Sequence, residues 1–182
     1  MVSTGQTFDV ADLVARLSRA GQKVAVAESL TGGLLLATLT AAPGVSAVLR
    51  GGAVVYATDT KAGQLDVDSQ LLAARGPVDP DVAVAMARGV RHRWGADLGV
   101  ATTGVAGPEP QDGHPVGEVY VAVADVYSAR VEAVPVPPAG TGPVPGREAI
   151  RAASVHAALQ LLDEWLAADG RPAEPPAGKP AA

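Results

Sequence analysis

The sequence contains no cysteine among its 182 residues. This absence excludes disulfide bonds, thiolate nucleophiles and cysteine-ligated metals, and it fits a cytosolic protein, because disulfides persist in oxidising compartments. Aromatic residues make up only 3%, so the core has to be built from Ala, Val and Leu. The sequence has no apolar run of about 18 residues, the length that spans a membrane, and residues 1–6 show no basic start of a signal peptide. We therefore expect a cytoplasmic protein without membrane contact.

Positive charge is also scarce, since the formal net charge is −5. Nucleic-acid-binding proteins usually carry a basic patch with interleaved aromatic residues. The one basic cluster lies on a helical pattern, and we interpret it as a solvated face: Arg88, Arg91, His92 and Arg93. We expect no direct contact with nucleic acid. The histidines are scattered without the spacing of metal ligands, so no metal site is expected: His92, His114 and His156.

Hydrophobic residues make up 48% of the chain and charged residues 18%, which is typical of a globular protein. Alternating apolar runs and amphipathic patterns predict the following elements. The predicted strands are 23–27, 51–57, 98–102, 116–124 and 131–136, and the predicted helices are 8–20, 34–41, 69–75, 80–94 and 147–168. This order predicts an α/β fold, a three-layer α/β/α sandwich with a mixed, mostly parallel central sheet. We expect a single domain over 1–168, a Pro/Gly loop at 137–145 and a disordered Pro/Ala-rich tail at 169–182.

The segment Ala27–Gly33 joins the first predicted strand to the helix that follows. Free backbone N–H groups and the helix dipole favour anions at such a position, and the glycines allow a ligand to approach the backbone. The hydroxyls of Ser29 and Thr31 lie beside these donors. A simpler interpretation is that one of them only caps the helix, and the segment alone favours this interpretation. The segment matches neither a P-loop nor a dinucleotide-binding fingerprint.

A second glycine-rich turn, Thr102–Pro108, directly follows the third predicted strand. In open α/β sheets, ligands gather outside the carboxyl ends of the strands. Two such turns therefore indicate a site at this edge of the sheet. The alternative is a tight turn that leads into a mobile loop over 109–114.

Three further side chains have chemistry that such a site would use. Lys61 activates a serine hydroxyl only if the fold places it near Ser29 and its pKa is lowered; otherwise it is a solvated surface group. Tyr56 either orients this lysine or lies at the edge of the core. Arg147, at the start of the last helix, either binds a phosphate or carboxylate with its forked donors or is exposed.

Several motifs occur together in one order along the chain: Ala27–Gly33, Pro43–Ser46, Gly51–Tyr56 with Lys61, Thr103–Pro108 and Pro115–Tyr120. In this combination the chain resembles the CinA C-terminal domain family, which includes the stand-alone nicotinamide-nucleotide amidohydrolases, over residues 8–167. The resemblance implies a three-layer α/β/α fold and a cytoplasmic bacterial enzyme. It implies hydrolysis of the carboxamide of nicotinamide mononucleotide to nicotinate mononucleotide and ammonia, with no metal or organic cofactor. It also implies a homodimer or a higher homo-oligomer.

The resemblance implies roles for individual residues. Ser29 matches the nucleophile and Lys61 its base, and Tyr56 is grouped with them. The implied substrate-binding positions are Glu28, Thr31, Gly32, Gly33, Ser46, Thr103, Gly104 and Arg147. Arg147 is expected near the substrate phosphate or carboxamide. Backbone N–H groups from Thr31 to Gly33 are expected to stabilise the oxyanion.

The chain departs from the family pattern at three places. Leu30 stands where the family commonly has cysteine, Pro145–Arg147 stands where it often has Gly-Asp-Arg, and the loop 109–114 is shorter than in many relatives. These departures leave open a catalytically inactive domain that binds a nucleotide or a protein partner. An amidase for a different small amide is another alternative. A role in DNA uptake or damage response is a third, although the acidic charge argues against direct DNA contact.

Overall fold

The computed structural model of the chain describes residues 8–136 and 146–168, and the predicted loop at 137–145 and tail at 169–182 lie outside them. Its centre is a five-stranded sheet in the order β2-β1-β3-β4-β5. The strands are β1 (Val24–Glu28), β2 (Leu49–Val54), β3 (Leu98–Gly104), β4 (Val119–Ala124) and β5 (Ala129–Ala133). β1 pairs in parallel with β2 and β3, whereas β4 runs antiparallel to both of its neighbours. The predicted mixed sheet is confirmed.

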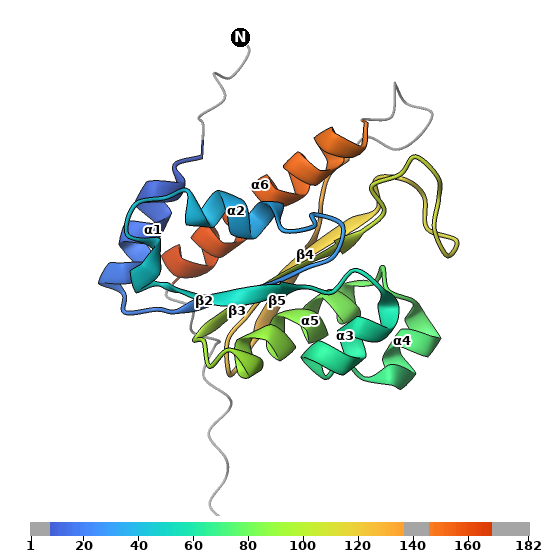
Figure 1. Cartoon of the computed structure of the whole chain (residues 1–182), viewed down its shortest axis with the longest axis horizontal. Coiled ribbons are helices and arrows are strands. Elements are labelled where there is room, and N and C mark those ends of the chain that lie inside the picture. Colours follow the sequence, from blue (N-terminus) through green and yellow to red (C-terminus); the bar gives the residue numbers. More distant parts are fainter. Residues whose placement is uncertain (1–7, 137–145, 169–182) are drawn as a thin grey trace, which may run out of the picture.

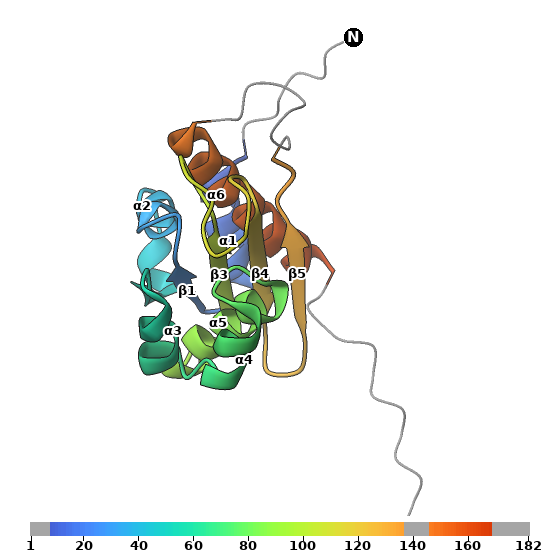
Figure 2. The same cartoon turned by 90° about the vertical axis from the view of Figure 1, so that its right-hand side faces the viewer.

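Helices cover both faces of this sheet. One face carries α1 (Val10–Arg19), α2 (Leu34–Thr40) and α6 (Arg147–Ala167). The other face carries α3 (Thr58–Leu65), α4 (Ser69–Arg75) and α5 (Pro80–Arg93), as Figures 1 and 2 show. A short 3-10 helix, η1 (Val45–Ala47), precedes β2. This arrangement is the predicted three-layer α/β/α sandwich. Among the described residues, no helix combines the length and the apolar character needed to cross a membrane.

The two faces of the central strands differ in side-chain size. Val24, Val26 and Val100 point into the cluster packed by α1, α2 and α6, whereas Ala25 and Ala27 point into the cluster packed by α5. Small side chains let α5 approach the sheet closely. A Cβ added at Gly99 would lie 1.9 Å from the carbonyl oxygen of Ala87 on α5. Alanine and glycine therefore set the spacing on the face that carries α3 and α5.

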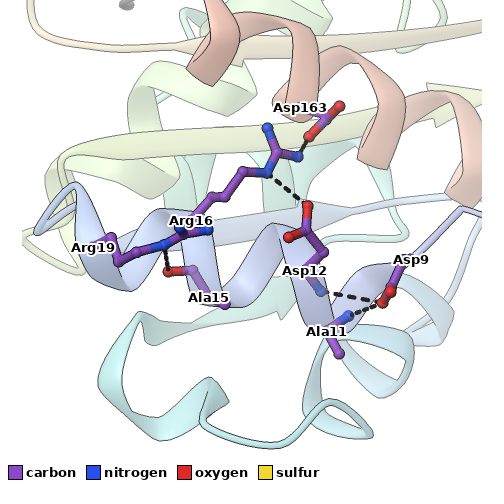
Figure 3. Close-up of polar contacts among 7 residues, drawn as sticks. All are labelled: Asp9, Ala11, Asp12, Ala15, Arg16, Arg19 and Asp163. Carbon is purple, nitrogen blue, oxygen red and sulfur yellow. Dashed lines mark hydrogen bonds and ion pairs between the residues drawn. The ribbon is translucent and has the colours of Figure 1, made fainter.

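Polar contacts begin α1 and attach it to the C-terminal helix (Figure 3). The Asp9 carboxylate caps the helix by accepting from the N–H groups of Ala11 (2.9 Å) and Asp12 (3.1 Å). Arg16 donates to Asp12 one turn earlier at 2.8 Å and forms an ion pair with Asp163 of α6. The ion pair connects α1 to α6, two helices that are far apart in the sequence but lie on the same face of the sheet.

The sequence pattern does not predict helix α3. Its sequence, Thr58–Leu65, is mostly polar and lacks the apolar repeat of an amphipathic helix, and only Lys61 and Leu65 are buried. Lys61 thus occupies a buried position of the helix, where an apolar residue would have given the repeat that predicts an amphipathic helix. The neighbouring strand β2 ends at Val54 rather than at residue 57, so Tyr56 lies in the β2–α3 connection.

Candidate active site

The structure brings Ser29 and Lys61 together. Ser29 follows the last residue of β1, and its N–H donates to the Thr102 carbonyl of β3 at 3.0 Å. Lys61 extends from α3, and its Nζ lies 3.2 Å from the Ser29 Oγ. Ser29 is 8% exposed and Lys61 is completely buried. The condition stated for a catalytic lysine, proximity to Ser29, is met.

Backbone carbonyls fix the Lys61 amine. Nζ donates to the carbonyl oxygens of Val55 at 2.8 Å and Tyr56 at 3.3 Å. Burial removes water from the ammonium form and lowers the Lys61 pKa from 10.5 to about 8, and nearby Asp59 partly opposes this shift. At pH 7 this shift raises the neutral fraction about 300-fold, to roughly one molecule in ten. A neutral amine has two hydrogens for the two carbonyls and keeps one lone pair for the serine hydroxyl.

Glu28 does not lie in the pocket with Ser29. Its carboxylate is completely buried and accepts from the N–H groups of Gly33 (2.9 Å), Leu35 (3.1 Å) and Leu36 (2.8 Å) at the start of α2. The sequence pattern predicts an anion site at this helix start. The protein itself supplies the anion, which is the Glu28 carboxylate. Glu28 points to the α2 face of the sheet, whereas Ser29 points to the α3 face. The prediction that Glu28 binds substrate is not supported by this position.

The other polar residues of the same turn also have internal partners. The Thr31 hydroxyl lies 2.7 Å from the Thr102 hydroxyl in the core. The N–H of Gly32 donates to the Ser29 carbonyl and that of Gly33 to Glu28. The predicted oxyanion donors at these two glycines are therefore occupied. In the part of the chain that the structure describes, the N–H groups of Leu30 and Thr31 have no acceptor.

Neither Thr31 nor Gly32 nor Gly33 is among the residues that line the pocket around Ser29. Ser46, another candidate from the resemblance, is exposed on η1 and does not line it either. Together with Glu28, five of the substrate-binding positions implied by the resemblance therefore do not line the pocket in the described chain.

The second glycine-rich turn does line the pocket. Thr103 and Gly104 end β3 beside Ser29. The Thr103 hydroxyl donates to the carbonyl of Pro77 at 2.6 Å, so it fixes the α4–α5 connection as a wall of the pocket. Gly104 is required by close packing, because a Cβ there would lie 2.6 Å from the Glu118 carbonyl oxygen.

Arg147 and Tyr56 meet across the opening of the pocket. The guanidinium donates to the Gly107 carbonyl at 2.6 Å and to the Tyr56 hydroxyl at 2.9 Å. Tyr56 is 59% exposed, and it contacts Lys61 through its carbonyl rather than its phenol. The Tyr56 side chain, predicted to orient Lys61, pairs with Arg147 instead, and only the backbone carbonyl of this residue contacts the lysine.

The pocket itself is small and polar, with a volume of about 70 Å³. Pockets that enclose drug-sized ligands measure about 300–1,000 Å³, so this one accommodates a small group such as a carboxamide and leaves the rest of a larger ligand at the opening. Its lining is Ser29, Leu30, Tyr56, Lys61, Pro77, Val78, Thr103–Gly107, Glu109, Gln111 and Arg147. A larger hollow of about 610 Å³ between α4, α5 and the β4–β5 turn contains none of the predicted site residues.

Sequence reasoning missed several contributors. The carbonyls of Val55 and Tyr56 and the wall at Pro77 carry no side-chain signal. Arg151, one helical turn after Arg147, donates to the Thr31 carbonyl at 2.6 Å and so holds the turn after β1 without lining the pocket. The described residues contain no group of three or more His, Asp or Glu side chains placed to hold a metal ion.

Comparison with known proteins supports one family. The CinA C-terminal domain family matches residues 8–166. A CinA-like protein of Frankia casuarinae is 49% identical over 144 residues, which are 79% of this chain and 32% of that protein. One of Gloeobacter violaceus is 45% identical over 149 residues, 81% of this chain and 34% of that protein. The chain thus spans about a third of the length of these curated relatives.

Solved structures cover the same region. The competence/damage inducible protein CihA from Agrobacterium tumefaciens is 34% identical with a TM-score of 0.76, covering 87% of this chain and 96% of that chain. The competence damage-inducible protein A from Klebsiella pneumoniae is 30% identical with a TM-score of 0.77, covering 88% and 98%. Both similarities extend over nearly the whole domain.

Proposed function

Because the chain belongs to the CinA C-terminal domain family, we propose that it is an amidohydrolase that converts nicotinamide mononucleotide to nicotinate mononucleotide and ammonia. The observation that carries this proposal is the buried Ser29–Lys61 pair with its lowered lysine pKa. A lysine buried without a carboxylate partner raises the free energy of the fold, and such perturbed groups cluster at functional sites. Cytoplasmic location and a homo-oligomeric state are part of the same proposal.

The first half of the reaction forms an acyl-enzyme. The Ser29 Oγ attacks the carboxamide carbon and its proton moves to the neutral Lys61 Nζ. The resulting ammonium then protonates the departing amide nitrogen, and the C–N bond breaks to release ammonia. The N–H of Leu30, next to the nucleophile, has no acceptor among the described residues and is the proposed oxyanion donor in place of the occupied glycines; one such donor typically contributes about 3 kcal/mol.

The second half hydrolyses the ester. Lys61, neutral again, takes a proton from water as the water oxygen attacks the acyl carbon. Ser29 leaves with the proton that Lys61 returns, and the carboxylic acid product loses its remaining proton to solvent and is released as the carboxylate. Arg147, at the opening of the pocket, is the proposed partner of the substrate phosphate, and it would exchange its bonds to Tyr56 and Gly107 for the phosphate oxygens.

Ammonia release from nicotinamide mononucleotide tests this proposal in the wild type, Ser29→Ala and Lys61→Met. Ser69→Ala, which removes an exposed serine at the start of α4, is the matched control. We expect both pocket variants to lose at least about 10³-fold in kcat and the control to keep its rate. Near wild-type turnover by Ser29→Ala would disprove the nucleophile assignment.

Two other results separate the alternatives. If calorimetry shows that the wild type binds the mononucleotide but the protein releases no ammonia, the domain is an inactive binding domain. The sequence feature that suggests this alternative is Leu30 in place of cysteine. Equal turnover of nicotinamide, nicotinamide riboside and the mononucleotide would indicate an amidase with broader specificity.

A further inference from the structure

The charged side chains of the pocket lie at different depths. The described lining contains Lys61, Glu109 and Arg147 as its charged residues. Lys61 is completely buried at the floor beside Ser29, whereas Glu109 is exposed. Glu109 therefore lies toward the opening and is the one acidic side chain of the described lining. Neither the Ser–Lys chemistry nor phosphate binding gives this carboxylate a role.

The chemistry of a quaternised nicotinamide supplies such a role. With the carboxamide carbon at Ser29, a pocket of about 70 Å³ holds little more than the amide, so the ring nitrogen lies nearer the opening. A quaternised ring nitrogen carries a positive charge that a free nicotinamide ring lacks. We propose that Glu109 is a specificity-determining residue that favours amides on a positively charged aromatic ring over neutral aromatic amides.

This inference rests on the proposed function, since it assumes that the reacting amide is placed at Ser29. Its physical basis is the electrostatic attraction between the carboxylate and the ring cation at a partly solvated opening. Such pairs contribute modestly, which corresponds to about a three- to tenfold preference. The attraction is screened by salt, so the preference decreases as ionic strength rises.

Asp112 provides a matched control in the same loop. It is exposed like Glu109, but it does not line the pocket. Its φ is 52°, a left-handed conformation that asparagine tolerates. Its carboxylate accepts from Gln111 Nε2 at 3.4 Å, a contact that the amide oxygen of asparagine preserves. Asp112→Asn and Glu109→Gln thus change the net charge equally, three positions apart.

The experiment uses two probes that differ by one methyl group and one charge, 1-methylnicotinamide and nicotinamide. Calorimetry gives the Kd of both for the full chain of the wild type, Glu109→Gln and Asp112→Asn. We expect the wild type to bind the cation more tightly. We expect Glu109→Gln to reduce the ratio of the two dissociation constants about three- to tenfold, and Asp112→Asn to leave it unchanged. The wild-type ratio should also fall between 20 and 500 mM salt, on the order of the same factor.

Several outcomes overturn the proposal. A wild type that binds both probes equally or binds neither refutes it, as does a ratio that is unchanged in Glu109→Gln or reduced as much in Asp112→Asn. Ammonia release from the mononucleotide is measured separately on the wild type. A wild type that prefers the cation through Glu109 without releasing ammonia contradicts the proposed reaction alone, whereas turnover with an unchanged ratio contradicts the role of Glu109 alone.

Discussion

Replacement of Lys61 by methionine tests the lowered lysine pKa independently of activity. In the fold this pKa is about 8, whereas the ordinary value of 10.5 represents the unfolded chain. Between these two values the unfolded chain binds more protons than the folded protein, so the stability of the wild type rises with pH across this window. From these two pKa values the lysine lowers the free energy of unfolding by about 3 kcal/mol at pH 7 and by about 1 kcal/mol at pH 10.

The measurement is urea unfolding of the wild type and Lys61→Met at pH 7, 8, 9 and 10. Methionine also removes the hydrogen bonds to Val55, Tyr56 and Ser29, but this loss depends little on pH and cancels when the difference between the two proteins is followed with pH. We expect the free energy of unfolding of the wild type, relative to the variant, to rise by about 2–3 kcal/mol from pH 7 to pH 10. Lys23→Met removes an exposed lysine and controls for the loss of one positive charge.

A difference that stays constant with pH would refute the reasoning. It would mean that Lys61 keeps an ordinary pKa in the fold, and the neutral amine that the proposed base requires would then be scarce near pH 7. The same outcome would follow if water entered the pocket and solvated the ammonium. The result therefore bears on the mechanism even if no substrate is available.

Three further substitutions have outcomes set by the contacts described. Glu28→Gln should lower the free energy of unfolding in urea by about 2 kcal/mol, because the amide cannot accept from all the N–H groups at the start of α2; an unchanged value would contradict the capping role. Asp59→Asn should move the rise of kcat/KM with pH to lower pH, since this carboxylate raises the Lys61 pKa; a shift to higher pH would contradict it. Gly104→Ala should destabilise the fold by roughly 1–3 kcal/mol in thermal unfolding, because its Cβ would meet the Glu118 carbonyl; a stable variant would show that this strand end moves freely.

The fold was predictable where local patterns and packing agree. The apolar run around Val24–Ala27 and the Asp79–Pro80 helix start both match the elements observed. Helix α3 was not predictable from local pattern, because its sequence is mostly polar and one of its two buried side chains, Lys61, is charged in its ordinary state. Local sequence gives no signal for a position where a lysine is buried at a cost in stability.

Some features of the candidate site were also predictable from the sequence, whereas others were not. The family resemblance predicted the pairing of Ser29 with Lys61. The sequence pattern alone left this pairing open, because the two residues are 32 positions apart. The strand alternation could have placed Glu28 on the opposite face from Ser29, since successive side chains of a strand point to opposite faces. The partners of Thr31 and the exposure of Ser46 depend on neighbouring elements and become visible only in the folded chain.

The Glu28 carboxylate accepts from the N–H groups at the positive end of α2 and does not line the pocket. The formal charge of the described lining is therefore that of Lys61, Glu109 and Arg147. Below the Lys61 pKa these sum to one positive charge, and above it they sum to zero. The phosphate of the proposed substrate would then be held more strongly in acid, whereas the proposed base would be active in alkali. If the proposed reaction holds, substrate binding and turnover have opposite pH preferences, and we expect the optimum for kcat/KM at lower pH than that for kcat.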